Sequence, residues 1–140
     1  MNSLCVAKPQ KISPKMKKKY DEEYIILKKK FMNNTRNAAK TVTALSLFSC
    51  DVNLISSVCL GALSSTLYAS EYVNYVDNLN EHNRQFPFHM GIPLAMVLTE
   101  TTINHSSLNL NLDYIETFAA FFSYKYALFV IMIDSLKIDE

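Results

Sequence analysis

The chain has 140 residues, a length that suits one domain, and 49% of them are apolar. Two glycines and four prolines are too few for a disordered or loop-rich protein, and so few glycines nearly exclude a phosphate-binding loop. The net charge of +1 is unevenly distributed: residues 1–40 carry eleven basic and three acidic side chains, a net +8, whereas residues 41–140 carry three basic and ten acidic ones, a net −7.

The sequence carries no recognisable catalytic or metal-binding motif. Its three cysteines form no CxxC pair, and its three histidines have no HExxH-type spacing. It contains neither GxGxxG nor GxSxG, and no pair of carboxylates argues for acid/base chemistry. We therefore expect a protein that is not an enzyme and that needs no metal ion or cofactor.

Residues 1–35 are predicted to form a basic N-terminal arm. From Lys15 to about Asn33 the pattern is helical, with apolar side chains on one side and lysines on the other, which is typical of an amphipathic helix at a membrane surface. A helix packed on a soluble protein is the competing interpretation. A nucleic-acid-binding tail is less favoured, because no nucleic-acid-binding module follows and hydrophobic segments begin at once. Residues 1–20 lack the apolar stretch of a signal peptide.

Residues 36–140 are predicted to form a transmembrane domain of four helices. The apolar segments are about 36–50, 54–73, 86–104 and 114–134. A spanning helix needs about 20 residues, so the second and fourth segments are long enough and the first and third are marginal. Asp51 and Asn53 indicate a tight turn after the first segment, because a charge in the middle of one long spanning helix would be costly. The rival interpretation is a soluble helical core, which the mean hydropathy of +0.04 favours, although the polar arm and turns dilute that average.

The expected fold class is all-α, a small multi-pass membrane helical bundle behind a basic amphipathic arm. The positive charge of the arm predicts an N-terminus on the cytoplasmic-type side of the membrane. Four spans would return the C-terminus to that side, together with the polar loop at 74–85. Glu71 and Asp134 are expected near the arm side as well.

Small side chains recur at every fourth position in three segments. They are Ser57, Gly61, Ser65 and Ala69 in the second, Gly91, Ala95 and Thr99 in the third, and Ala119, Ser123 and Ala127 in the fourth. Such ridges let helix backbones approach closely in lipid, where packing and weak polar contacts drive association. The ridges either pack together in a compact bundle, which we prefer, or leave one ridge for a partner helix.

Lys125 stands out because it lies near the middle of the most apolar segment. At 1.5 Å per residue it is about 18 Å from Asp113 and about 13 Å from Asp134, and neither carboxylate matches its depth. Charged residues inside a membrane are candidates for functional sites. Lys125 could reach toward the arm side, hydrogen-bond to tyrosine or serine groups, or pair with a carboxylate of another subunit. Glu100, on the ridge side of the third segment, is the second candidate.

The last segment carries a family resemblance. The stretch LDYIETFAAFFSYKYALFVIMIDSL resembles the final helix of the ATP synthase protein I domain family, most closely the version in chloroplast ATP synthase assembly factors of the green lineage. The matching core is Phe121, Phe122, Ser123, Tyr124 and Lys125. Upstream, GALSSTLYASEYVNYVDNL resembles the second helix of the family, and IPLAMVL, with Pro93, resembles the third. Order and spacing agree over about residues 20–136.

The chain also departs from the family pattern at two places. The family tends to have basic residues just after the position of Tyr68 and a more glycine-rich second helix, whereas Ser70, Glu71 and Asn74 stand here. Its third helix tends to open with arginine, where this chain has His89 and Met90.

The resemblance implies a non-enzymatic role. Proteins of this family assist assembly of the c-subunit rotor ring of F-type ATP synthase, which would place this chain in a plastid thylakoid membrane with its N-terminus on the stromal side. The implied partners are membrane lipid and ATP synthase c subunits, with no nucleic acid. The residues expected to serve such a partner inside the membrane are Lys125, Tyr124, Ser123, Gly61, Ser65, Pro93 and Glu100.

A permanent accessory transmembrane subunit of a photosynthetic or respiratory complex is the alternative. The eight tyrosines and eight phenylalanines would then contact neighbouring helices, lipids, or chlorophyll and carotenoid at an interface with a photosystem or antenna. The candidate ligands for chlorophyll magnesium are His89, Glu100 and Glu116, although a polar residue buried without pigment is the commoner arrangement. A small cation transporter, based on Glu100 and Lys125 alone, is a third hypothesis.

Overall fold

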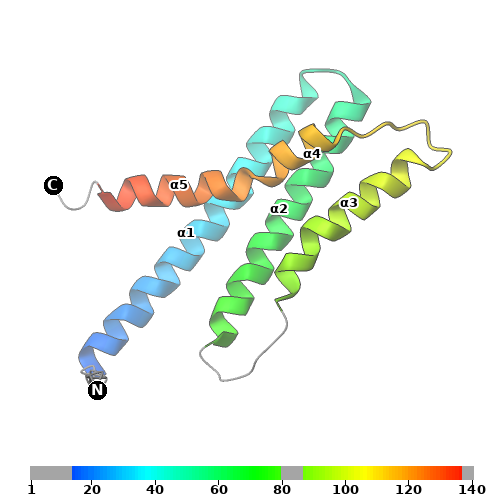
Figure 1. Cartoon of the computed structure of the whole chain (residues 1–140). Helices are drawn as coiled ribbons and strands as arrows, with labels where there is room; N and C mark the ends of the chain where they lie inside the picture. The colour runs from blue at the N-terminus through cyan, green and yellow to red at the C-terminus, as the bar shows by residue number, and fades with distance from the viewer. Residues whose placement is uncertain (1–13, 80–86, 137–140) are drawn as a thin grey trace, which may run out of the picture.

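The fold is entirely helical in the part of the chain that the structure describes. This computed structural model describes residues 14–79 and 87–136. Its elements are α1 (Pro14–Leu47), α2 (Val52–Leu79), the short 3₁₀ helix η1 (Phe88–Met90), α3 (Gly91–Asn104), α4 (Tyr114–Phe121) and α5 (Ser123–Leu136) (Figure 1). No β-strand occurs in these residues, which confirms the predicted all-α class.

α1 and α2 form an antiparallel hairpin. α1 is a continuous helix of 34 residues, about 51 Å long at 1.5 Å per residue. It continues through residue 35 without a break, so the helix of the basic arm and the first apolar segment form a single helix.

The hairpin turn occupies residues 48–51, where Asp51 and Asn53 indicate it. Asp51 caps α2, because its Oδ1 accepts the Asn53 N–H at 2.9 Å and satisfies a donor that has no partner within the helix. Cys50 turns the chain with a φ of 54°, in the left-handed region that favours glycine. Local turn chemistry therefore decides where the hairpin reverses.

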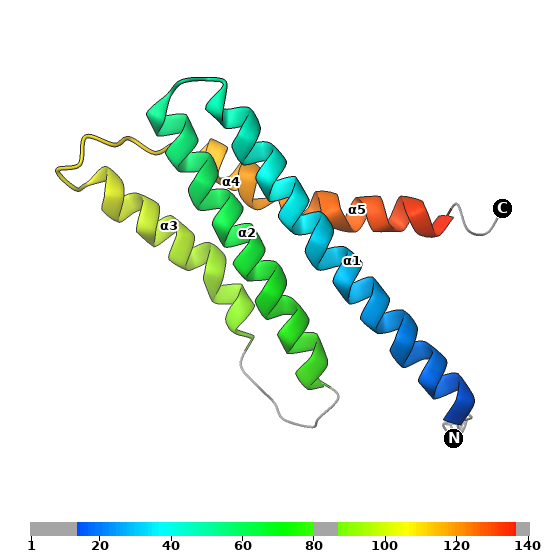
Figure 2. The same ribbon diagram turned by 180° about the vertical axis from the view of Figure 1, so that it is seen from behind.

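α1, α2 and α3 lie side by side in one layer, and α4 and α5 cross one face of it (Figure 1). Seen from behind, α1 and α2 cover α4 and the beginning of α5, and α5 extends past α1 away from α3 (Figure 2). α4 packs chiefly on α2, and α5 packs chiefly on α1. The last two helices thus hold the hairpin together from one side.

The fourth apolar segment is bent, which corrects the expectation of a single helix over 114–134. α4 ends at Phe121 and α5 begins at Ser123, with Phe122 between them at a ψ of 2°. The Lys125 N–H donates to the Phe122 carbonyl at 2.9 Å, an i to i+3 bond that tightens the chain at the bend. The bend redirects α5 from α2 toward α1.

Hydrogen bonds from two asparagine side chains hold the connection between α3 and α4 in place. The Asn104 side chain donates to the Leu112 carbonyl at 3.0 Å and accepts the Leu112 N–H at 2.6 Å. The Asn53 side chain accepts the Asn111 N–H at 3.1 Å, which ties this connection to the start of α2. These bonds satisfy backbone groups that no helix can satisfy.

The side chains buried within the chain are mostly small, and many large apolar side chains are exposed. Ala69 and Ala127 are fully buried beside Phe31 and Val73. Exposed large side chains occur on all five α-helices and include Leu45, Leu63, Leu67, Leu94, Leu98, Ile115, Tyr126, Phe129 and Met132. A soluble monomer rarely displays so many, so these faces are suited to lipid or to partner helices.

Two helical stretches are long and apolar enough to cross a membrane, namely α2 and Tyr114–Asp134. In their most apolar windows only 39% and 28% of the residues are buried inside the protein, whereas the core helix of a soluble protein is mostly buried. α3, with 14 residues, is about 21 Å long, short of the roughly 30 Å of a bilayer's hydrocarbon core. Within the described residues the count of candidate spans is therefore two, compared with the four expected.

Candidate functional site

The seam between α2 and α4 is a close helix contact, and Gly61 makes it possible. A Cβ built on Gly61 would lie 2.1 Å from the Thr117 carbonyl oxygen and 2.8 Å from the Ala120 Cβ. Real Cβ atoms do not approach so closely, so the two backbones can meet only where a side chain is missing. Thr117 and Ala120 are themselves buried at this contact.

Two serines of α2 bond to the chain just before and just after α4. Ser57 Oγ accepts the Asp113 N–H at 2.9 Å, immediately before α4 begins. Ser65 Oγ lies 2.8 Å from Ser123 Oγ and accepts the Tyr124 N–H at 3.1 Å, at the start of α5. The first N–H groups of a helix lack partners within it, so Ser65 satisfies a donor that the bend exposes.

The α2 ridge is thus used within the chain, as the compact-bundle interpretation predicts. Ser57, Ser65 and Ala69 are all fully buried, and Gly61 is buried with them. The small residues of the fourth segment are only partly enclosed, since Ser123 and Ala127 are buried but Ala119 is exposed. The α3 ridge is exposed at all three of its residues, Gly91, Ala95 and Thr99. Gly91 has no atom within 4 Å of a Cβ built on it.

An aromatic cluster encloses His89, a feature that the sequence analysis missed. The His89 ring lies 5.5 Å from Tyr68, 5.5 Å from Tyr72 and 4.9 Å from Tyr75, measured between ring centroids. Tyr68 also contacts Tyr124, with centroids 4.7 Å apart. His89 is 4% exposed, and its Nδ1 has no hydrogen-bond partner among the described residues. The sequence does contain a pattern that indicates this cluster: the three tyrosines are spaced by four and then three residues, which places them on one face of a helix.

Glu100 of α3 is fully buried, and Thr117 of α4 lies beside it. Both of its carboxyl oxygens lack a hydrogen-bond partner within the part of the chain that is described, and so does the Thr117 hydroxyl, which lies close enough to interact with it. A charged carboxylate in such surroundings costs several kcal/mol, and an uncharged carboxyl group costs far less. Glu100 forms no ion pair with Lys125, the other residue singled out inside the expected membrane segments.

Lys125 lies in the first turn of α5, directly after the bend, and its side chain is exposed. Its Nζ is 4.7 Å from the centroid of the Phe122 ring, a cation–π contact. No carboxylate in residues 14–79 or 87–136 forms an ion pair with it. Of the predicted set, Gly61, Ser65, Ser123 and Tyr124 come together at the seam, while Lys125 faces outward beside them.

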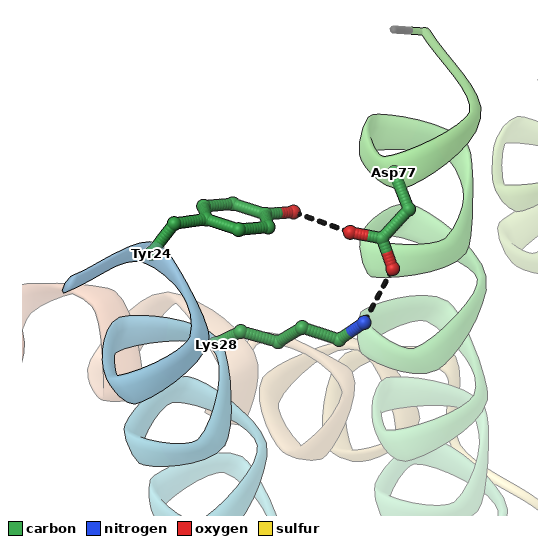
Figure 3. Close-up of polar contacts among 3 residues, drawn as sticks. All are labelled: Tyr24, Lys28 and Asp77. Atoms are coloured by element: carbon green, nitrogen blue, oxygen red, sulfur yellow. Dashed lines mark hydrogen bonds and ion pairs between the residues drawn. The ribbon is translucent and has the colours of Figure 1, made fainter. Parts of the chain in front are cut away.

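The arm end of α1 is anchored by ion pairs, which the sequence analysis did not identify. Tyr24 donates its hydroxyl to Asp77 Oδ1 at 2.7 Å, and Lys28 pairs with the other carboxylate oxygen of Asp77 (Figure 3). Lys30 Nζ lies 2.7 Å from Asp134 of α5, so that Asp134 does lie beside the arm helix, as expected.

These contacts shift the acidities of two groups at this end. Lys28, and then Tyr24, hold the pKa of Asp77 below its usual value. Burial, followed by the bond to Asp77, raises the pKa of Tyr24 to about 12. Asp77 is therefore charged at neutral pH, and it ties the arm end of α1 to α2.

The remaining predicted residues lie apart from one another. Pro93 is half-buried in the first turn of α3, where its missing N–H costs no helical bond. Glu116 is half-buried in the first turn of α4 and lines a polar hollow with Asp51 and Asp113. No cluster of His, Cys, Asp and Glu in the described ranges is arranged to hold a metal ion.

Comparison with known proteins found no match to this chain among protein-family models, curated sequences or solved structures.

Proposed function

We propose that this chain is a non-enzymatic membrane protein that binds other membrane proteins through its outer helix faces and assists their assembly. The exposed apolar side chains on α2, α3 and α5 support this proposal, because they need lipid or helices around them. The small side chains at the α2–α4 seam support the membrane setting alone, since close backbone packing drives helix association in lipid, where the hydrophobic effect contributes little.

The proposed topology has four spans, with segments about 36–50, 54–73, 86–104 and 114–134. α2 and α4–α5 supply the two long spans, and the shorter α1 and α3 segments require a locally thinned bilayer. The basic residues of α1 support an N-terminus on the cytoplasmic-type side, which is the stroma in a plastid.

The single observation that carries the assembly role is the exposed ammonium of Lys125. It stands on an apolar helix with a phenylalanine ring as its neighbour and no described carboxylate as its counter-ion. A cation in that position favours a partner that brings a carboxylate into the membrane. The rotor c subunits of F-type ATP synthase, apolar hairpins with a buried carboxylate, have this chemistry. The resemblance of residues 121–125 to the ATP synthase protein I domain points to the same partner in a plastid thylakoid.

The test is purification of the tagged chain from its native membranes in mild detergent, followed by mass spectrometry of the proteins that accompany it. We expect c subunits in excess over the other synthase subunits. Lys125→Met should lower their recovery roughly tenfold or more, because it leaves a buried carboxylate unpaired, and Lys125→Arg should largely retain them. Undiminished recovery of c subunits with Lys125→Met would show that the ion pair is not the basis of binding.

A permanent accessory subunit is the second candidate, and the exposed face of α3 is the observation that favours it. Gly91, Ala95 and Thr99 form an outward ridge flanked by the exposed Leu94 and Leu98, a surface suited to a lasting helix neighbour. A photosystem, antenna or respiratory complex recovered in equal stoichiometry with the chain would support this role, with chlorophyll or carotenoid sought in the same preparation. An assembly factor would instead be scarce relative to the finished complex.

A further inference from the structure

We propose that the groove between α1 and α2 is a binding site for an anionic phospholipid, whose headgroup contacts Arg36 and Lys40 and whose acyl chain lies along the groove. This inference rests on the proposed membrane location. It concerns a face of the hairpin that contains neither the α2–α4 seam nor Lys125.

Small side chains on both helices leave the groove open. Its volume is about 470 Å³, and the surface exposed inside it is mostly apolar, although Arg36, Lys40, Thr43 and Thr66 are among its lining residues. Ala39, Ala44 and Ala62 contribute no more than a methyl group each, and Leu47 and Leu63 form apolar walls. α1 and α2, which form its two sides, lie side by side as an antiparallel hairpin (Figure 2). A slot of this kind accepts a flexible hydrocarbon chain.

The charges at one end of the groove are unsatisfied. Arg36 and Lys40 lie one helical turn apart on α1, and both are exposed and line the groove. Neither forms an ion pair with any carboxylate of the described residues. Two nearby lysines of the same helix differ in this respect, since Lys28 pairs with Asp77 and Lys30 pairs with Asp134. Two uncompensated cations beside an apolar slot are complementary to a headgroup that carries a negative charge above an acyl chain.

The length of the groove fits one leaflet. Arg36 and Leu47 are eleven residues apart, about 16 Å along the helix, and the hydrocarbon core of a bilayer is about 30 Å thick. Arg36 lies toward the basic end of α1, so the headgroup would lie on the arm side. Lys40, one turn deeper, can reach the same level with its flexible side chain.

A second groove on the same helix serves as an internal comparison. It lies between α1 and α5, has a similar volume of about 450 Å³, and is lined by Asn34, Asn37, Thr41 and Tyr126, among others. No cation lines it. The two grooves are therefore similar in volume but differ in charge, and the α1–α2 groove is the one suited to an anionic lipid.

The experiment is native mass spectrometry of the full-length chain released from nanodiscs that contain phosphatidylcholine and phosphatidylglycerol, with the bound lipids counted. The wild-type chain should retain phosphatidylglycerol in preference to phosphatidylcholine. Removing each basic residue should weaken that preference roughly fivefold, so that Arg36→Gln with Lys40→Gln nearly abolishes it. The matched control is Lys18→Gln with Lys29→Gln, which removes two exposed lysines of α1 outside the groove and should leave the preference intact.

A third variant tests the slot itself. Ala44→Trp fills the apolar part of the groove but keeps both cations, and the exposure of Ala44 makes it compatible with the fold. It should displace the bound lipid. Retention of phosphatidylglycerol by Ala44→Trp, or equal losses in the groove and control pairs, would overturn the proposal in favour of diffuse attraction to the basic helix. Loss of the chain from carbonate-washed membranes would refute the membrane location. A chain that stays in the membrane but shows no lipid preference would refute the lipid site alone.

Discussion

The contact at Gly61 allows a sharp test of the fold, through the substitution Gly61→Ala. The added Cβ would lie 2.1 Å from the Thr117 carbonyl oxygen, more than 1 Å inside an ordinary contact distance of 3.4–4 Å. The obstacle is backbone, not the end of a flexible side chain, so α4 must move away from α2. That movement would also lengthen the bonds from Ser57 to Asp113 and from Ser65 to Ser123. We expect a loss of about 3 kcal/mol in the free energy of unfolding, at the upper end of overpacking effects.

The assay is reversible unfolding in mixed micelles, followed by helical circular dichroism as the fraction of denaturing detergent rises. Gly91→Ala is the matched control, because the added Cβ would have no atom within 4 Å and the helix there is exposed. It should be neutral or stabilise the chain by up to about 1 kcal/mol, since alanine loses less backbone entropy than glycine. Equal stabilities of the two variants would refute the close packing of α4 on α2.

Three further predictions use the same unfolding measurement. Cys50→Gly should raise the stability by about 0.5–1 kcal/mol, because a left-handed φ of 54° strains cysteine and not glycine, and an unchanged or lower stability would argue against this turn. Asp77→Asn should cost less than about 1 kcal/mol at neutral pH, since the pair with Lys28 is partly exposed. The pKa of Asp77 is lowered in the folded wild-type chain, so the stability difference between wild type and Asp77→Asn should be present above the unfolded pKa near 3.8. It should vanish as the pH falls through the folded pKa, and a stability difference that persists in acid would contradict the ion pair. Ser65→Ala should cost about 1–3 kcal/mol, because it removes the partner of the buried Ser123 hydroxyl and of the part-buried Tyr124 N–H. A double-mutant cycle with Ser123→Ala should show a coupling, whereas additive losses would exclude the hydrogen bond between the two serines.

Local sequence determined the helices and where they turn. The α1–α2 turn follows from Asp51, whose side chain caps the next helix, and the all-α class follows from long apolar stretches with few glycines and prolines. The two stretches long enough to cross a membrane, α2 and Tyr114–Asp134, match the two segments whose length and composition were sufficient. These features depend on residues close together in the chain, so they can be deduced from short-range pattern alone.

Tertiary contacts decided which faces of the helices are buried. All three small-residue ridges look alike in sequence, yet the α2 ridge is enclosed and the α3 ridge is exposed, because only α2 is crossed by α4 at a backbone contact. A helix that is apolar all round carries no polar stripe to mark its outer side. The enclosure of His89 and Glu100 depends likewise on which neighbour each helix meets.

The bend at Phe122 and the ion pairs of α1 are non-local in the same way. The Ser65 hydroxyl, 59 residues from Tyr124, accepts the N–H that the bend leaves free, and Asp77 meets Lys28 only because the hairpin aligns α1 with α2. The sequence by itself determined that Lys125 would lack a nearby counter-charge along its own helix. Its exposure beside the bend was decided by the tertiary structure, since α5 turns away from α2 at Phe122 and packs on α1.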